Sequence, residues 1–217
     1  MNNKQIVILD YGLGNVKSMK NALEQFDCKV KLSNDRQEIM ESSGLILPGV
    51  GAFAAGMDGL KSYNLISTIN DFSSTNKPIM GICLGMQMLF TESEEFGNTK
   101  GLNLIKGKVK RMIPKLKEES KLPHISWNNL YEPNEKKWKG TLLESSNSSS
   151  EFYFVHTYAA EPDDESDVLS VTKYSGINFC SSVKKNNIYG FQFHPEKSSQ
   201  NGLQVIHNFI DLCILDT

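Results

Sequence analysis

Apolar and polar residues alternate along the first half of the chain in a pattern that predicts strands and helices in turn. Residues 6–10 are apolar on both faces and read as a central strand, and residues 28–32 and 44–48 suit two further strands. Residues 16–26 carry apolar side chains at helical spacing between the first two strands. This alternation predicts a parallel sheet with helices on both faces.

Two helices and a fourth strand follow. Residues 52–60 and 65–72 read as helices. Ile79 and Met80 form a short apolar run after a proline, which suits a buried strand, and residues 86–90 suit a buried helix. These elements add one strand to the predicted parallel sheet.

The pattern becomes less regular after residue 90. Residues 92–95 hold three glutamates and are interpreted as a solvated helix end. Residues 101–113 are strand-like. Residues 122–129 are interpreted as a loop in which His124 and Trp127 cover the core.

The last third of the chain is rich in strand-forming residues. The aromatic content of residues 151–156 predicts a strand. Turn residues separate three further predicted strands, so this part is expected to add an antiparallel region. These strands and the final predicted helix lie at residues 168–174, 177–183, 188–193 and 202–214.

The composition is that of an ordinary globular protein, with 39% hydrophobic and 22% charged residues in a chain of 217. A chain of this length can bury a sizeable core in one domain. We therefore expect a single α/β domain over residues 1–217, with a mostly parallel central sheet, flanking helices and an antiparallel region in the second half. The formal net charge of −2 gives no reason to expect nucleic acid or an anionic membrane as a partner.

The four cysteines lie far apart without a Cys-x-x-Cys pair, so the sequence indicates no zinc site and no redox dithiol, and no cofactor is expected. Residues 1–5 lead into only four apolar residues, which are too few for a signal-peptide core or a membrane span. We therefore expect a cytoplasmic protein with reduced thiols.

One cysteine lies in a motif of its own. Residues 81–85 read Gly-Ile-Cys-Leu-Gly and join the predicted strand to the predicted buried helix. This is the cysteine form of the nucleophile elbow, a strained turn in which glycines allow neighbouring chains to approach closely. The start of the following helix favours the reactive thiolate. From this motif alone, Cys83 is either a nucleophile or an inert core cysteine.

A candidate base follows the last predicted strand. A cysteine nucleophile needs a base to take its proton, and the base must be held in the right tautomer. His194 and Glu196 are two residues apart, so in an extended chain their side chains point to the same side. Pro195 favours extension at His194. The alternative is a surface histidine and glutamate that happen to follow a strand.

Residues 48–51, Pro-Gly-Val-Gly, directly follow the third predicted strand. Ligands bind at the carboxyl ends of strands in open α/β sheets. This segment is therefore either a simple turn or an oxyanion hole, in which backbone N–H groups stabilise a developing negative charge.

These motifs together resemble a known family. Residues 81–87 and residues 193–196 resemble the class I (triad) glutamine amidotransferases. The resemblance extends over essentially the whole chain. In detail, the chain is similar to the glutaminase subunits of imidazole glycerol phosphate synthases. The segments that carry this finer likeness are residues 10–15, 48–51, 154–158 and 192–198.

The resemblance implies hydrolysis of L-glutamine to glutamate and ammonia. Cys83 would attack the side-chain amide and form a glutamyl thioester. His194 would take the thiol proton and give it to the leaving ammonia, and Glu196 would orient His194.

The resemblance also implies three further groups of residues. The oxyanion hole would comprise Gly49, Val50, Gly51 and the N–H of Leu84. The amino-acid end of glutamine would be held by Gln87, Glu95 and the backbone at Thr157 and Tyr158. The partner interface would include Asn15, Trp127 and Lys197.

By the same resemblance, ammonia passes into a (β/α)8-barrel synthase partner in a heterodimer. That partner makes imidazole glycerol phosphate and an aminoimidazole carboxamide ribotide for histidine and purine synthesis, and the glutaminase is nearly silent until the partner holds its ligand. Ser126 stands where the family usually has glycine, and residues 174–176 also depart from the common pattern. Both departures leave the triad unchanged but lie in the region that determines which partner binds.

Three alternatives stay open at this point. The first is a paralogous glutaminase that supplies ammonia to a different synthase, such as one that amidinates surface sugars. The second is a partner-free hydrolase of γ-glutamyl peptides, and the third is a non-catalytic binding subunit. Steady activity without a partner would favour the second, and an inert Cys83 would favour the third.

Overall fold

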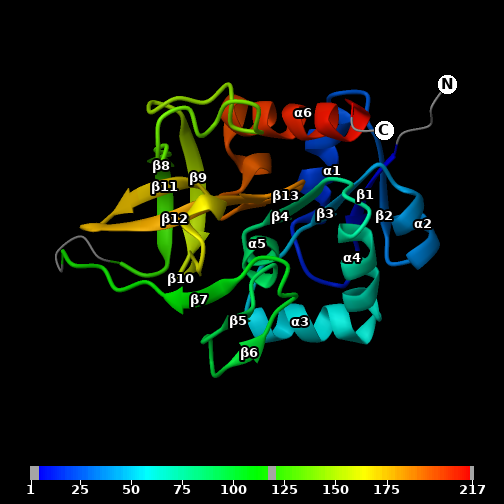
Figure 1. Cartoon of the computed structure of the whole chain (residues 1–217), viewed down its shortest axis with the longest axis horizontal. Coiled ribbons are helices and arrows are strands. Elements are labelled where there is room, and N and C mark those ends of the chain that lie inside the picture. Colours follow the sequence, from blue (N-terminus) through cyan, green and yellow to red (C-terminus); the bar gives the residue numbers. More distant parts are fainter. Residues whose placement is uncertain (1–4, 117–120, 216–217) are drawn as a thin grey trace.

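The computed structural model describes residues 5–116 and 121–215. Its centre is a parallel ladder of five strands in the spatial order β2-β1-β3-β4-β13 (Figure 1). The strands are β1 (Gln5–Leu9), β2 (Lys29–Ser33), β3 (Gly44–Leu47), β4 (Ile79–Ile82) and β13 (Ile188–Phe191). The last strand of this ladder comes from the end of the chain, and it therefore brings the two ends of the sequence into one sheet.

The same sheet continues beyond β13 with mostly antiparallel pairing. A separate antiparallel pair, β8 with β9, lies beside this extension, and in it His124 faces His156. The continuing strands are β12 (Ile177–Lys185), β10 (Tyr158–Pro162), β7 (Gly107–Arg111), β5 (Glu92–Ser93) and β6 (Thr99–Lys100), with β11 (Val168–Tyr174) paired to β12. The separate pair is β8 (His124–Asn129) and β9 (Glu151–His156).

Helices cover both faces of the parallel ladder because its strands are apolar on both sides. In β1, Ile6 and Ile8 pack into one hydrophobic cluster, whereas Val7 and Leu9 pack into the other. The first cluster includes side chains of α1 (Val16–Glu24) and α6 (Ser199–Leu215). The second includes side chains of α2 (Arg36–Glu41), α3 (Phe53–Ser62), α4 (Leu65–Ser73) and α5 (Leu84–Met88).

Two short 3-10 helices complete the described elements, η1 (Glu165–Asp167) and η2 (Pro195–Lys197). The second follows β13 directly. None of the helices in the described ranges has the length and apolar character needed to cross a bilayer.

The α/β class, the parallel ladder and the antiparallel extension are confirmed, but three local predictions are wrong. Residues 122–129 are not a loop, because residues from His124 onward form β8 and pair with β9. The glutamates of 92–95 do not end a helix, since Glu92 and Ser93 form β5. Of residues 101–113, only 107–111 form a strand.

One glycine shows how tightly η2 and α6 are joined. A Cβ built on Gly202 would lie 1.9 Å from the backbone oxygen of Pro195. We expect Gly202→Ala to destabilise the protein by about 1–3 kcal/mol, the usual range for forcing extra atoms into a packed site. Urea unfolding measures this loss. Gln204→Ala, an exposed change in the same helix, is the control and should leave the free energy of unfolding within about 0.5 kcal/mol of the wild-type value.

Candidate active site

Cys83 occupies the sharp turn between β4 and α5. Its backbone has φ +53° and ψ −109°, a conformation that non-glycine residues rarely adopt. The flanking glycines make the turn possible, because a Cβ on Gly81 would lie 2.8 Å from the Gly85 oxygen and one on Gly85 would lie 1.8 Å from the Leu47 oxygen. The strand, turn and helix therefore hold the thiol at the carboxyl edge of the sheet.

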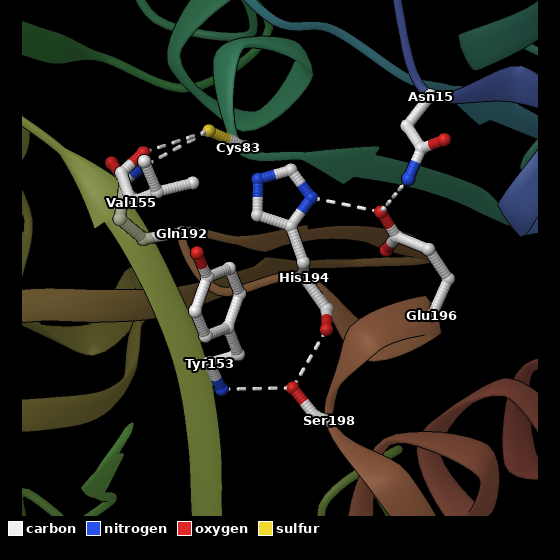
Figure 2. Close-up of polar contacts among 8 residues, drawn as sticks. All are labelled: Asn15, Cys83, Tyr153, Val155, Gln192, His194, Glu196 and Ser198. Carbon is white, nitrogen blue, oxygen red and sulfur yellow. Dashed lines mark hydrogen bonds and ion pairs between the residues drawn. The ribbon is translucent and has the colours of Figure 1, made fainter. Parts of the chain in front are cut away.

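His194 and Glu196 follow β13, the strand next to β4. His194 is extended and Glu196 lies in the first turn of η2. His194 Nδ1 and Glu196 Oε1 are 2.8 Å apart, and both side chains are 2% exposed. Figure 2 shows the imidazole between Cys83 and Glu196, with its second nitrogen turned toward the sulfur. That nitrogen, Nε2, is buried and has no hydrogen-bond partner among the described residues.

The charge state of His194 is set by competing effects. Burial alone lowers the pKa of the imidazole, but the neighbouring Cys83 and Glu196 side chains outweigh it and raise the pKa to about 10. The site therefore favours a protonated imidazole between two groups that can carry negative charge. This arrangement suits the transfer of a proton to a group that leaves the carbon atom attacked by the sulfur.

A cavity of about 260 Å³ opens beside the thiol. It brings together residues from six separate segments of the sequence, most of them predicted site residues. The lining residues are Val50, Gly51, Cys83, Leu84, Gln87, Glu95, Pro123, Val155, His156, Thr157, Tyr158 and His194. Gly49 and Glu196 lie instead at a smaller neighbouring cavity together with Asn15.

Comparisons with known proteins agree with this arrangement. The family described as "Glutamine amidotransferase class-I" matches residues 7–212. The chain belongs to the class-I glutamine amidotransferases. It is 43% identical over 211 residues to "Imidazole glycerol phosphate synthase subunit HisH 1" of Legionella pneumophila (strain Lens), covering 95% of this chain and 99% of that protein.

This amidotransferase is also 44% identical over 213 residues to "Imidazole glycerol phosphate synthase subunit HisH" of Methanosarcina barkeri, covering 97% of this chain and 100% of that protein. Among solved structures, one described as "Crystal structure of glutamine amidotransferase" matches with a TM-score of 0.70 at 15% identity, covering 96% of this chain and 99% of the other. The structural match shows the shared fold.

The segment after β3 packs closely on the elbow of this amidotransferase. Gly49 is buried, and a Cβ there would lie 2.9 Å from the backbone nitrogen of Gly85. The Tyr11 hydroxyl donates a hydrogen bond to the Pro48 oxygen and ties the start of the segment down. Val50 is 40% exposed and Gly51 has φ +100°, so the segment turns outward at the cavity mouth.

The two predicted substrate-binding side chains are already held by the protein. The Gln87 amide donates to the Tyr158 oxygen at 3.0 Å and to Gln192 Oε1 at 2.9 Å. Glu95 Oε2 accepts from the backbone N–H of Phe53 at 2.6 Å, which anchors it to the start of α3. Both side chains therefore meet the cavity in fixed positions.

The three predicted interface residues fall into two places. Asn15 donates from Nδ2 to Glu196 Oε1 at 3.3 Å and thus contacts the carboxylate that is paired with His194 (Figure 2). Trp127 is 45% exposed, and its ring centroid lies 5.9 Å from that of Tyr153. Lys197 places Nζ 5.9 Å from the same Tyr153 ring.

Sequence reasoning missed Gln192. This side chain is fully buried, accepts from Gln87, and donates from Nε2 to the Cys83 sulfur at 3.7 Å. It also missed Ser198, whose hydroxyl donates to the His194 oxygen at 2.6 Å and accepts from the Tyr153 N–H at 3.0 Å. A signal for Gln192 was present, since it lies near the end of the predicted strand 188–193 and two residues before His194, which in an extended chain puts both side chains on the same side.

Proposed function

We propose that this chain hydrolyses L-glutamine to glutamate and ammonia through Cys83, His194 and Glu196. The proposal is carried mainly by one observation: Cys83 and His194 line a cavity, and the imidazole lies between the thiol and the Glu196 carboxylate (Figure 2). The family and the names of the relatives support it.

The reaction follows from this order of groups. His194 takes the proton of the Cys83 thiol, and the thiolate attacks the side-chain carbonyl carbon of glutamine to form a tetrahedral intermediate. The protonated His194 gives its proton to the leaving nitrogen, so that ammonia departs and a glutamyl thioester is left on Cys83. His194, now neutral, takes a proton from water, and the resulting hydroxide attacks the thioester carbonyl. Glutamate is released as the sulfur leaves and takes the proton back from His194. Glu196 keeps the imidazole oriented throughout.

The negative oxygen of the intermediate needs hydrogen-bond donors. We assign the Leu84 N–H and the backbone of Gly49–Val50–Gly51 to this role. Leu84 follows Cys83 in the elbow, and Val50 and Gly51 line the same cavity. Glycine on both sides of Val50 makes rotation of that segment sterically easy, so we propose that it reorients when the enzyme is activated.

The amino-acid end of glutamine carries one positive and one negative group. We propose that the Glu95 carboxylate binds its ammonium group, and that Gln87 with the backbone at Thr157 and Tyr158 binds the remainder. All four of these residues line the cavity beside the thiol. The anchoring of Glu95 to α3 means that little side-chain freedom is lost on binding.

We propose that the ammonia is used by a (β/α)8-barrel synthase subunit in a heterodimer, which forms imidazole glycerol phosphate and an aminoimidazole carboxamide ribotide. The relatives at 43% and 44% identity are named as subunits of imidazole glycerol phosphate synthase, which supports this choice. Asn15, Trp127 and Lys197 would face that partner. We also propose a single domain over residues 1–217 and a cytoplasmic location, in keeping with its free cysteines.

The test is ammonia release from glutamine by the purified chain, alone and with the barrel subunit of the same organism plus that subunit's ribonucleotide ligand. We expect low activity alone and a rise of about 100-fold or more with the liganded partner. At about 1.4 kcal/mol per factor of ten in rate, such a rise corresponds to about 2.8 kcal/mol of added transition-state stabilisation. A chain whose Cys83 reacts with a glutamine-like alkylating agent but whose activity does not rise would exclude this partner. Full activity of the isolated chain would also contradict the proposal.

A further inference from the structure

Two further histidines form a buried pair next to the glutamine pocket, and the proposed chemistry does not use them. His124 on β8 and His156 on β9 face each other, with relative exposures of 0% and 6%. His124 Nδ1 and His156 Nε2 are 3.0 Å apart. Two of the four histidines in the chain therefore form one hydrogen-bonded pair between adjacent strands.

The inner end of this pair reaches the pocket. His156 Nδ1 lies 2.8 Å from the Tyr158 carbonyl oxygen. The same oxygen accepts the hydrogen bond from the Gln87 amide at 3.0 Å, and Gln87 in turn contacts Gln192. Gln192 donates to the Cys83 sulfur. A continuous chain of buried and partly buried hydrogen bonds thus runs from the histidine pair to the nucleophile.

The direction of the protons in the pair can be worked out from its inner end. A carbonyl oxygen only accepts, so His156 must carry its proton on Nδ1. A neutral His156 then has a lone pair on Nε2, and the proton shared with His124 must come from His124 Nδ1. Burial lowers the pKa of both imidazoles, that of His156 to about 3, so both are neutral near pH 7.

The outer end consequently needs a hydrogen-bond donor. With its proton on Nδ1, neutral His124 presents a lone pair at Nε2. The Ser126 hydroxyl lies 2.8 Å from this nitrogen, and Asn128 Oδ1, an acceptor, lies 2.7 Å from it. With the amide as it stands, the Ser126 hydroxyl donates to Asn128 Oδ1, 2.5 Å away. That orientation would also turn the amide oxygen toward the Nε2 lone pair, so the required tautomer needs the Asn128 amide turned around, with its nitrogen donating to Ser126 Oγ. In that arrangement the Ser126 hydroxyl proton is free to donate to His124 Nε2, 2.8 Å away, and to hold His124 in the required tautomer.

We propose that Ser126 is a positioning residue for glutamine binding, which fixes the tautomers of His124 and His156 and thereby holds the Tyr158 carbonyl and Gln87 in place. This inference rests on the proposed function of the pocket. Side chains alternate between the two faces of β8, so Ile125 and Trp127 lie on the face opposite His124 and Ser126 and are 57% and 45% exposed. The same strand therefore links the proposed partner interface at Trp127 to the histidine pair.

The wild-type protein gives the first test. Nitrogen-15 NMR of imidazoles distinguishes a ring protonated on Nδ1 from one protonated on Nε2, and four histidines give a simple spectrum. We expect neutral His124 and His156, both protonated on Nδ1, near pH 7. A proton on His124 Nε2 would overturn the proposal without any variant being made.

The second test compares Ser126→Ala and Ser126→Gly, which lack the hydroxyl, with Ser126→Thr, which keeps it. Each is assayed for glutaminase activity in the complex with the liganded barrel subunit. We expect the KM for glutamine to rise about fivefold in the Ala and Gly variants, the size of one lost hydrogen bond, with kcat within about twofold. The Thr variant should keep a near wild-type KM, and the Ala variant should show mixed tautomers of His124.

The outcomes separate this inference from the function beneath it. A wild-type complex without glutaminase activity would count against the proposed function, whereas the NMR result would still decide the tautomers. An active wild-type complex with unchanged KM in the Ala or Gly variant would overturn the role of Ser126. An equal rise of KM in all three variants would also overturn it, because the hydroxyl would then not be the deciding group.

Discussion

Replacing Cys83 with serine is expected to lower glutamine-dependent ammonia release by about 10⁴-fold or more, the scale seen when a nucleophile is removed from a catalytic triad. A serine hydroxyl holds its proton far more firmly than a thiol, and His194 in its present surroundings is arranged to give a proton rather than to extract one from an alcohol. Activity is measured in the complex with the liganded barrel subunit. The same complex supplied with free ammonia should keep its synthase activity, since only the source of nitrogen is removed.

Cys28→Ser is the matched control for this prediction. Cys28 is a half-buried cysteine outside the cavity, and its replacement removes a thiol without touching the elbow. It should leave ammonia release within about twofold of wild type. If the Cys83 variant kept more than about one per cent of the activity while folded, another group would have to be the nucleophile.

Glu196→Gln is expected to reduce kcat by about 10²–10⁴-fold, with the larger value matching the loss when a triad carboxylate is replaced by its amide. The amide can donate to His194 Nδ1 and so favours the tautomer with the proton on Nε2, which cannot accept the thiol proton. The carboxylate's charge is lost as well. Because binding of glutamine does not involve Glu196, the effect should fall on kcat rather than on KM.

The same variant should change the titration of His194 in a definite direction. Burial lowers the pKa of this imidazole, and Cys83 and Glu196 together raise it to about 10. Removing one of the two raising groups leaves the lowering effect in place, so His194 should lose its proton at a lower pH than in the wild type. NMR titration measures this shift. Glu165→Gln, an exposed change in η1, is the control and should leave both kcat and the His194 titration unaltered.

The sequence predicted those parts of the site that depend on local order. The elbow could be read from a strand, two glycines and a helix in succession, and His194 with Glu196 from their spacing around a proline. Both features arise within a few residues, and the structure contains them where expected. The choice between an inert and a reactive Cys83 needed the distant base, whose position depends on the pairing of β4 with β13.

The parts that were missed depend on distant partners. Residues 122–129 lack a strong strand pattern of their own and become strand only by pairing with β9. From its local pattern Glu95 looked like a solvated charge, and only the family resemblance predicted a site role for it, because its partner, the N–H of Phe53, lies 42 residues away. Gln192 owes its place to Gln87, which is 105 residues away. In each case the deciding contact was tertiary and therefore not visible in the local sequence.

The pairing of β4 with β13 has a consequence for the order of events in folding. These neighbouring strands are separated by about a hundred residues of chain, and contacts of such long range form late because closing the loop costs conformational entropy. Cys83 ends one of these strands and His194 follows the other. Partly folded chains can therefore acquire the first helices and strands without any catalytic competence. Recovery of activity during refolding marks completion of the central sheet, not its beginning.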